Sequence, residues 1–316
     1  MPGSCKQLQL DKIPANVMLV VDRSGSIAKP WDQGQNKWTS VHETLTTAIA
    51  NNQAGIKFGL KMFPSANATS DYSEAACVTS ATLEVPLALA NSANISAALP
   101  PAFGPAAGGS PTAKGLTAAV KALQGAPASE GRTIVFISDG PFNCMAGAQD
   151  NSSLFEILDE DPHSIVADAW TQDGISTIVV GVGVSGDTSG VVKDGNPDNT
   201  NAYSHFQTLA VEGGQPRAGE EKFYAAYTEA ELAGFMVEAI DKAETCTLAL
   251  GLTPIDPEST TIKVAGTSYP YMPGLNCATG NGWVYSDGNN TRLALCGTAC
   301  DALKSVGSAE VDVDCE

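Results

Sequence analysis

Five oxygen-bearing side chains stand at the ends of expected strands and helices, where they could meet around a cation. They are two carboxylates and three hydroxyls: Asp22, Ser24, Ser26, Thr112 and Asp139. The first three form an Asp-x-Ser-x-Ser pattern directly after the apolar run 17–21, which predicts a buried strand. Asp139 follows a second apolar run at 132–138, and Thr112 opens an expected helix at 112–123 behind Pro111. Because open α/β sheets bind ligands at the carboxyl ends of their strands, these side chains predict one shared site.

Oxygen ligands of this kind suit a hard divalent cation. Mg²⁺ prefers octahedral oxygen coordination and keeps several waters, so neutral hydroxyls and a few carboxylates can hold it with a position to spare. The Asp-x-Ser-x-Ser pattern alone is weak, because short Asp/Ser/Gly clusters after strands also form turns with local hydrogen bonds. The prediction therefore depends on all three segments together.

These three segments, in this order, resemble the metal-ion-dependent adhesion site of the von Willebrand factor A family. The resemblance covers roughly residues 13–245, and all five positions match. It implies that Ser24, Ser26 and Thr112 bind the cation directly, whereas Asp22 and Asp139 act largely through bound waters. It also implies that an Asp or Glu of a partner completes the coordination. Mg²⁺ is the expected ion, with Mn²⁺ or Ca²⁺ as alternatives.

Strands and helices are expected to alternate along the first 245 residues. The apolar patterns predict strands at 17–21, 56–63, 81–89, 132–138, 175–182 and 222–226, and helices at 37–51, 91–99, 112–123, 164–171, 205–210 and 229–244. Such alternation is typical of an α/β fold with a doubly wound, mostly parallel, Rossmann-like sheet. This architecture agrees with the resemblance.

The composition changes near residue 245, where Ala- and Glu-rich sequence gives way to Thr-, Gly- and Pro-rich sequence. We therefore expect a von Willebrand A domain at 1–245 and a small Cys-rich β domain at 246–316. Five short strands are expected in the second domain: 247–252, 261–264, 282–285, 291–295 and 309–313. The segments 282–283 and 295–300 look similar to tails of secreted von Willebrand A proteins of predatory and gliding bacteria, of the myxobacterial type.

Eight cysteines form an even set without Cys-x-x-Cys spacing, which favours disulfides in an oxidising compartment over a metal cluster. The fold of the resembling family brings its ends together, which implies a Cys5–Cys246 bond. The other expected pairs are Cys77–Cys144, Cys277–Cys296 and Cys300–Cys315. A lipidated Cys5 is the alternative. A Cys5–Cys246 bond would restrain the last helix of the domain, whose movement switches affinity in the family, so we expect one dominant affinity state.

Three other patterns are weaker. Residues 181–186 fit Gly-x-Gly-x-x-Gly, but a long polar loop follows instead of a helix, which argues against a dinucleotide site. Residues 194–198 begin like a calcium loop and then lack its sixth-position Gly and twelfth-position Glu, so a solvated loop is expected. The histidines His42, His163 and His205 have neither zinc-binding nor nucleophile-elbow spacing, so we expect no catalytic chemistry.

The charge and hydropathy restrict the partners and the compartment. Seventeen basic and thirty-five acidic residues give a net charge of −18, which disfavours nucleic acid and anionic membranes. No apolar stretch approaches the length of a transmembrane helix, and the chain shows no signal peptide at its start. Together with the cysteines, these features predict a mature secreted or surface-exposed protein.

The leading hypothesis is an adhesion or recognition module that binds a carboxylate-bearing protein or glycan through a divalent cation. The alternative is a structural or assembly subunit of a surface complex, in which the metal only stabilises the loops. A third hypothesis, a hydrolase with a site assembled in space, would need turnover that depends on a histidine. Loss of binding on Asp22→Ala substitution with an intact fold would separate the first hypothesis from the second.

Overall fold

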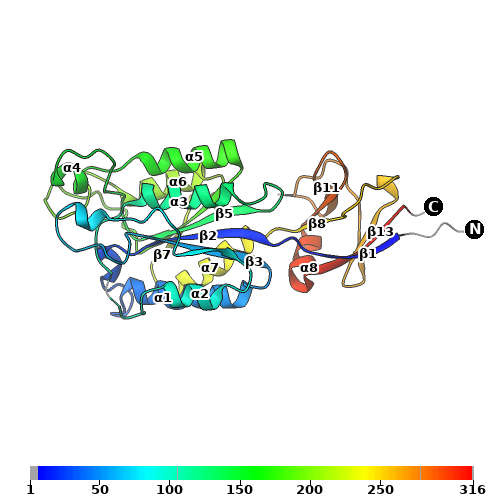
Figure 1. The fold of residues 1–316 in the computed structure, drawn as a ribbon, viewed down its shortest axis with the longest axis horizontal. Helices are drawn as coiled ribbons and strands as arrows, with labels where there is room; N and C mark the ends of the chain where they lie inside the picture. The colour runs from blue at the N-terminus through cyan, green and yellow to red at the C-terminus, as the bar shows by residue number, and fades with distance from the viewer. Residues whose placement is uncertain (1–5, 105, 278, 315–316) are drawn as a thin grey trace, which may run out of the picture. The chain divides into compact units, whose positions relative to one another are not determined.

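The computed structural model describes residues 6–104, 106–277 and 279–314, and it divides the chain into two compact units (Figure 1). The larger unit comprises residues 15–243. The other combines residues 6–14 with the described residues from Glu244 onward. The expected division placed the N-terminal residues in the first domain, whereas the structure places them in the second unit.

The larger unit is built on a six-stranded sheet, ordered β4-β3-β2-β5-β6-β7. Its strands are β2 (Ala15–Asp22), β3 (Ile56–Phe63), β4 (Val85–Ala88), β5 (Arg132–Ser138), β6 (Ser176–Val182) and β7 (Tyr224–Ala226). Only β4 runs antiparallel to its neighbour; the other pairs are parallel. This arrangement confirms the predicted α/β fold with a mostly parallel sheet.

Helices cover both faces of this sheet (Figure 1). One face carries α1 (Lys37–Asn52), α2 (Ser92–Ala98) and α7 (Glu229–Ala243), and the other carries α3 (Thr112–Gln124), α5 (Asp161–Asp173) and α6 (Ala202–Glu212). Every residue of β2 is buried, and its side chains alternate between two cores: Val17, Leu19 and Val21 in one, Met18 and Val20 in the other. Burial on both faces explains why this strand is a continuous apolar run.

The expected elements of this unit are present, with shifted ends. The third strand is shorter than expected, at Val85–Ala88, while α5 and α6 each extend beyond the predicted helices. A short helix α4 (Asn151–Phe155), capped by Asp150, was not predicted. Five residues with one polar cap give too little periodicity to reveal such a helix.

Among its described residues, the smaller unit contains two antiparallel sheets and one α-helix. A four-stranded sheet has the order β1-β13-β9-β10, and a three-stranded sheet has the order β11-β12-β8. The elements are β1 (Lys6–Asp11), β8 (Thr247–Ala249), β9 (Thr261–Val264), β10 (Thr267–Tyr269), β11 (Gly282–Tyr285), β12 (Arg292–Cys296), α8 (Thr298–Val306) and β13 (Ser308–Val313). Trp283 is fully buried in the core of this unit. The five expected strands are present, but β1, β10 and α8 were missed.

The N-terminal residues belong to this unit because β1 pairs with β13 along its whole length, from Lys6 opposite Val313 to Asp11 opposite Ser308. The alternation of exposed and half-buried residues in β1 was too weakly apolar to be recognised as a strand. The pairing partner lies at the other end of the chain, which no local pattern indicates.

The disulfides confirm two of the predicted pairs and overturn the other two. Cys77–Cys144 and Cys277–Cys296 are bonded as expected. Cys246 is bonded to Cys300, so the predicted Cys5–Cys246 and Cys300–Cys315 pairs are wrong. Cys5 and Cys315 themselves lie outside the described residues. The Cys246–Cys300 bond follows from strand pairing. The carbonyl of Cys246 accepts a hydrogen bond from the amide of Leu295 (2.9 Å), near the end of β12. Helix α8 begins directly after β12 and carries Cys300 in its first turn, which brings Cys300 close to Cys246. The argument for a single affinity state, which depended on Cys5–Cys246, is therefore lost.

Candidate metal centre

The five predicted site residues lie at the carboxyl ends of two central strands and at one helix start. Asp22 is the last residue of β2, and Asp139 directly follows β5, the strand paired with β2. Ser24 and Ser26 lie in the turn and short 3₁₀ helix η1 (Gly25–Ala28) after β2, and Thr112 is the first residue of α3. Parallel pairing of β2 with β5 brings the two carboxylates to one edge of the sheet.

Four of these residues form one hydrogen-bonded group. The Ser24 amide donates to Asp22 Oδ1 (2.7 Å), and the Ser24 and Ser26 hydroxyls lie 2.9 Å apart. The Ser26 hydroxyl donates to Asp139 Oδ1 (2.7 Å). The chain of contacts thus links both carboxylates through both serine hydroxyls.

Thr112 is not hydrogen-bonded into this group; the segment before it reaches the turn after β2, where the Gly25 amide donates to the Gly108 carbonyl (3.0 Å). The Thr112 side chain is fully buried, and its hydroxyl donates to the carbonyl of Ser110 (3.3 Å). The Ser110 amide in turn donates to the Asn143 side chain (2.7 Å), and Ser110 lines the same hollow as Ser24 and Ser26.

Burial favours the protonated form of the Asp22 side chain. The residue has no exposed surface, and this desolvation, reinforced by the negative charge of Asp139, raises the pKa of Asp22 to about 7. Hydrogen bonds from Ser138 and Ser24 oppose the rise in this pKa. A cation bound between Asp22 and Asp139 would favour the charged form of Asp22.

Two residues that the sequence analysis missed contact the carboxylates of Asp22 and Asp139. The Ser138 hydroxyl, at the end of β5, donates to Asp22 Oδ2 (2.5 Å). Lys37, the first residue of α1, places its ammonium 2.8 Å from Asp139 Oδ2. The position of Ser138 next to Asp139 could have indicated its role. Lys37 stands in a polar segment far from either strand end, and no sequence signal pointed to it.

The donor set fits a small octahedral cation. Bonds of about 2.1 Å, as Mg²⁺ makes, place neighbouring ligand oxygens about 3 Å apart. The Ser24 and Ser26 hydroxyl oxygens already lie 2.9 Å apart. The remaining donors are carboxylate and hydroxyl oxygens, with no sulfur or nitrogen among the five residues, which favours Mg²⁺, Mn²⁺ or Ca²⁺ over softer ions.

The weaker sequence patterns form ordinary loops. After β6 the chain continues without a helix until α6 begins at Ala202, so no helix start stands ready for a dinucleotide phosphate at residues 181–186. In the calcium-like segment, Asp194 accepts from the Asn196 amide (3.0 Å) and Asp198 from the Val192 amide (2.9 Å). These carboxylates are turned toward their own loop.

Residues 17–141 match the family model of the von Willebrand factor type A domain. With the doubly wound sheet and its helices on both faces, this match shows that the chain contains a von Willebrand A-type domain. The chain matches no curated protein sequence.

Several solved structures are similar to this chain at low sequence identity. The pilus adhesin SpaC from Lactobacillus rhamnosus GG is 15% identical with a TM-score of 0.52, and the alignment covers 99% of this chain and 41% of the adhesin. BatB from Bacteroides thetaiotaomicron is 16% identical with a TM-score of 0.45, covering 72% of this chain and 98% of BatB. Proximal thread matrix protein 1 from the mussel byssus, in a structure with a zinc-occupied adhesion-site motif, is 15% identical with a TM-score of 0.41, covering 78% of this chain and 52% of that protein. The chain thus spans less than half of the adhesin, and its likeness to the adhesin concerns the fold alone.

None of the helices in the described part of the chain is both long enough and apolar enough to span a membrane.

Proposed function

We propose that the larger unit is a recognition module that binds a carboxylate group of a protein or glycan through a divalent cation. The observation that carries this proposal is the hydrogen-bonded group of Asp22, Ser24, Ser26 and Asp139, with its two serine oxygens at the spacing of an octahedral edge. A cation bound there supplies an electrophilic position for a ligand oxygen from outside. The module performs no catalytic chemistry of its own.

Each residue has a distinct part in this proposal. Ser24, Ser26 and Thr112 offer neutral hydroxyl oxygens, which leave a bound cation electron-poor. Asp22 and Asp139 supply the negative charge, and the Ser138 hydroxyl and the Ser24 amide keep the Asp22 carboxylate in one orientation. Because the protein orients these groups before binding, little ordering entropy opposes capture of the cation.

The partner's carboxylate is expected on a surface that is otherwise neutral or basic. The chain carries a net charge of −18, so a strongly acidic partner would be repelled at long range. Two lysines, Lys29 and Lys37, line the hollow that contains Asp139. They favour the approach of a single anionic group to an otherwise acidic protein.

We place this module outside the cell or on its surface, as the sequence predicted, in a secreted bacterial protein of the type that carries a Cys-rich tail. Three disulfides among the described residues support an oxidising compartment. The fold shared with a pilus adhesin agrees with this location.

Isothermal titration of chelator-stripped protein with Mg²⁺, Mn²⁺ and Ca²⁺ tests the metal centre. We expect one ion per chain, no measurable binding to Asp22→Ala, and at least tenfold weaker binding to Ser26→Ala, which removes one oxygen from a half-buried side chain. Asp168→Ala, which removes an exposed carboxylate on α5, is the matched control and should bind like the parent. Equal binding by the parent and Ser26→Ala would refute the assignment.

A second titration tests the partner chemistry and the alternative function. Acetylated peptides with and without one Asp or Glu should differ in affinity for the Mg²⁺-loaded protein, and EDTA should abolish the difference. A natural partner, once isolated, that remains bound in EDTA would indicate the assembly subunit instead, with the metal only stabilising the loops.

A further inference from the structure

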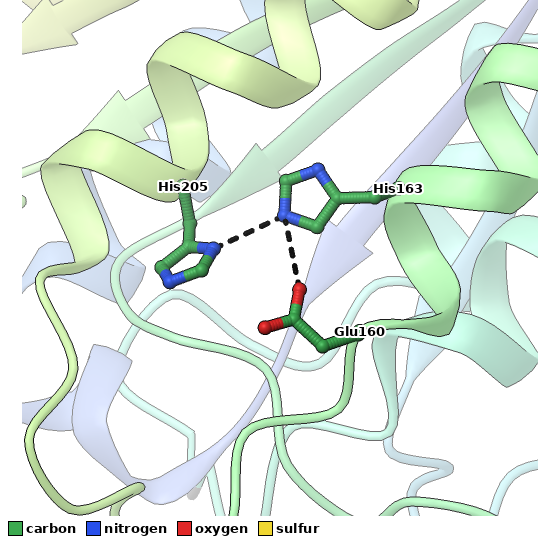
Figure 2. A group of neighbouring side chains, drawn as sticks. All are labelled: Glu160, His163 and His205. Carbon is green, nitrogen blue, oxygen red and sulfur yellow. Dashed lines mark hydrogen bonds and ion pairs between the residues drawn. The ribbon is translucent and has the colours of Figure 1, made fainter.

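A second group of metal-ligating side chains lies outside the candidate metal centre, between α5 and α6 (Figure 2). Glu160 immediately precedes α5, His163 lies in its first turn, and His205 lies in the first turn of α6. One ligand atom from each residue lies within 4.8 Å of those from the other two. The two helices bring together histidines that are 42 residues apart, which is why their sequence spacing did not indicate a metal site.

The two imidazoles face each other closely. His163 Nε2 lies 3.1 Å from His205 Nδ1, and Glu160 Oε2 lies 3.9 Å from the same His163 nitrogen. A tetrahedral zinc ion with bonds of about 2.0 Å places neighbouring ligand atoms about 3.3 Å apart. The histidine pair is within a few tenths of an ångström of that spacing. Glu160, whose side chain is 69% exposed, is free to move the remaining distance.

Glu212 supports one of these histidines from behind. Its Oε2 lies 2.6 Å from His163 Nδ1, whereas His205 lies at the other ring nitrogen, Nε2. A carboxylate in this position accepts the Nδ1 proton, so that Nε2 presents its lone pair to the group. This is the same arrangement that orients histidine ligands in metal sites.

The His163 ring is largely buried beside an aromatic side chain. The His163 side chain is only 12% exposed, and the ring of Phe142 packs 6.0 Å from it. The apolar surroundings of a metal site limit the access of solvent, so this packing shields a metal bound at His163 Nε2 from bulk water.

From these contacts we propose that Glu160, His163 and His205 bind one Zn²⁺ ion, with Glu212 as the orienting carboxylate. Two nitrogens and one carboxylate oxygen are a donor set that Zn²⁺ accepts and that Mg²⁺ and Ca²⁺ disfavour. Three protein ligands leave the fourth tetrahedral position to water or to a group of a partner. The ion joins the first turn of α5 to the first turn of α6.

This zinc site has a consequence for the neighbouring loop. Residues 183–201 precede α6, and several of them, including Ser185, Asp187 and Asn196, line the hollow that contains Asp139. Fixing the first turn of α6 fixes one end of this loop. Zinc is therefore expected to stabilise the rim of the candidate metal centre without entering it.

Titration of the full chain with Zn²⁺ tests the site. Two samples prevent zinc from binding at the candidate metal centre during this titration. One sample is the Asp22→Ala variant, and the other is the parent protein in excess Mg²⁺. Both should bind one zinc ion. His205→Gln should weaken this binding at least a hundredfold, and Glu212→Gln about ten- to a hundredfold, as loss of an orienting carboxylate does in known zinc sites. X-ray absorption at the zinc edge should show two imidazole ligands.

The third histidine of the chain provides the matched control. His42 lies in α1, so His42→Gln removes an imidazole and leaves the group intact; its zinc affinity should equal that of the parent. Absence of zinc binding from both samples, or equal binding by His205→Gln and His42→Gln, would overturn the proposal. The two imidazoles would then form only a hydrogen bond between α5 and α6. Mg²⁺ binding at the candidate metal centre is measured separately, so either proposal can fail without the other.

Discussion

Replacement of Lys37 by methionine should raise the affinity of the candidate metal centre for Mg²⁺. The Lys37 ammonium lies 2.8 Å from Asp139 Oδ2, and the two side chains are 13% and 1% exposed. In the metal-free protein this ammonium therefore neutralises a carboxylate that the cation also needs. Methionine keeps most of the apolar length of lysine, which packs near Gly183, and removes only the charge.

The size of the effect follows from Coulomb's law. Two unit charges 4 Å apart interact by about 4 kcal/mol at an effective dielectric constant of about 20, and by about 1 kcal/mol in water. A divalent cation has twice the charge of an ammonium. Its repulsion by an ammonium about 8 Å away therefore also lies between about 1 and about 4 kcal/mol. Because the Lys37 side chain is mostly buried, we expect its removal to improve the free energy of Mg²⁺ binding by more than the value of about 1 kcal/mol for water. A gain of about 1.4 kcal/mol corresponds to tenfold tighter binding.

Isothermal titration with Mg²⁺ measures this change, and Lys29→Met is the matched control. Lys29 lines the same hollow but is exposed, and its removal should change the affinity by less than about threefold, as expected for a screened surface charge. Without metal, Lys37→Met should also unfold at a lower temperature, because the buried Asp139 loses its counter-ion. Unchanged or weaker Mg²⁺ binding by a folded Lys37→Met protein would refute the reasoning.

Three further predictions concern stability and pH. Double replacement of Cys77 and Cys144 by alanine should destabilise the larger unit by about 4 kcal/mol in urea unfolding, since the bond closes a loop of 67 residues; a loss under about 1 kcal/mol would contradict this. Mg²⁺ affinity should fall about tenfold from pH 8 to pH 6, because a pKa of about 7 leaves Asp22 mostly protonated at the lower pH, and a flat profile would contradict it. Burial also raises the pKa of Asp159 to about 6, above its value in the unfolded chain, so this group lowers folding stability progressively as pH rises from about 4 to about 6. Asp159→Asn should therefore stabilise the protein by about 1 kcal/mol at pH 7 and not at pH 4, as measured by urea unfolding at both pH values.

The fold of the larger unit was predictable because its patterns are local. The continuous apolar runs of β2 and β5 indicate strands buried on both faces, and their order with the helices indicates a parallel sheet. Parallel strands end at one edge, so residues after two such strands could be expected to meet. Asp22, Ser24, Ser26 and Asp139 do meet there. Whether they hold a cation stays a prediction until the titration is made.

The small unit was less predictable because its order depends on contacts between the two ends of the chain. β1 is weakly apolar, and only its pairing with β13 makes it a strand. The Cys246–Cys300 bond likewise follows from the pairing of β8 with β12, which brings Cys246 to the start of α8. Cysteine spacing gives no information on such pairing, since an even set allows many connectivities.

The sequence by itself determined which oxygen ligands stand at the strand ends, because a strand, the turn after it and a helix start are each encoded within a few neighbouring residues. Only the tertiary structure decided what faces those ligands. The packing of α1 brings the Lys37 ammonium to Asp139, and the packing of α5 beside α6 brings His163 to His205. Such contacts depend on how whole elements pack against the sheet, and no periodicity within one segment records the position of another.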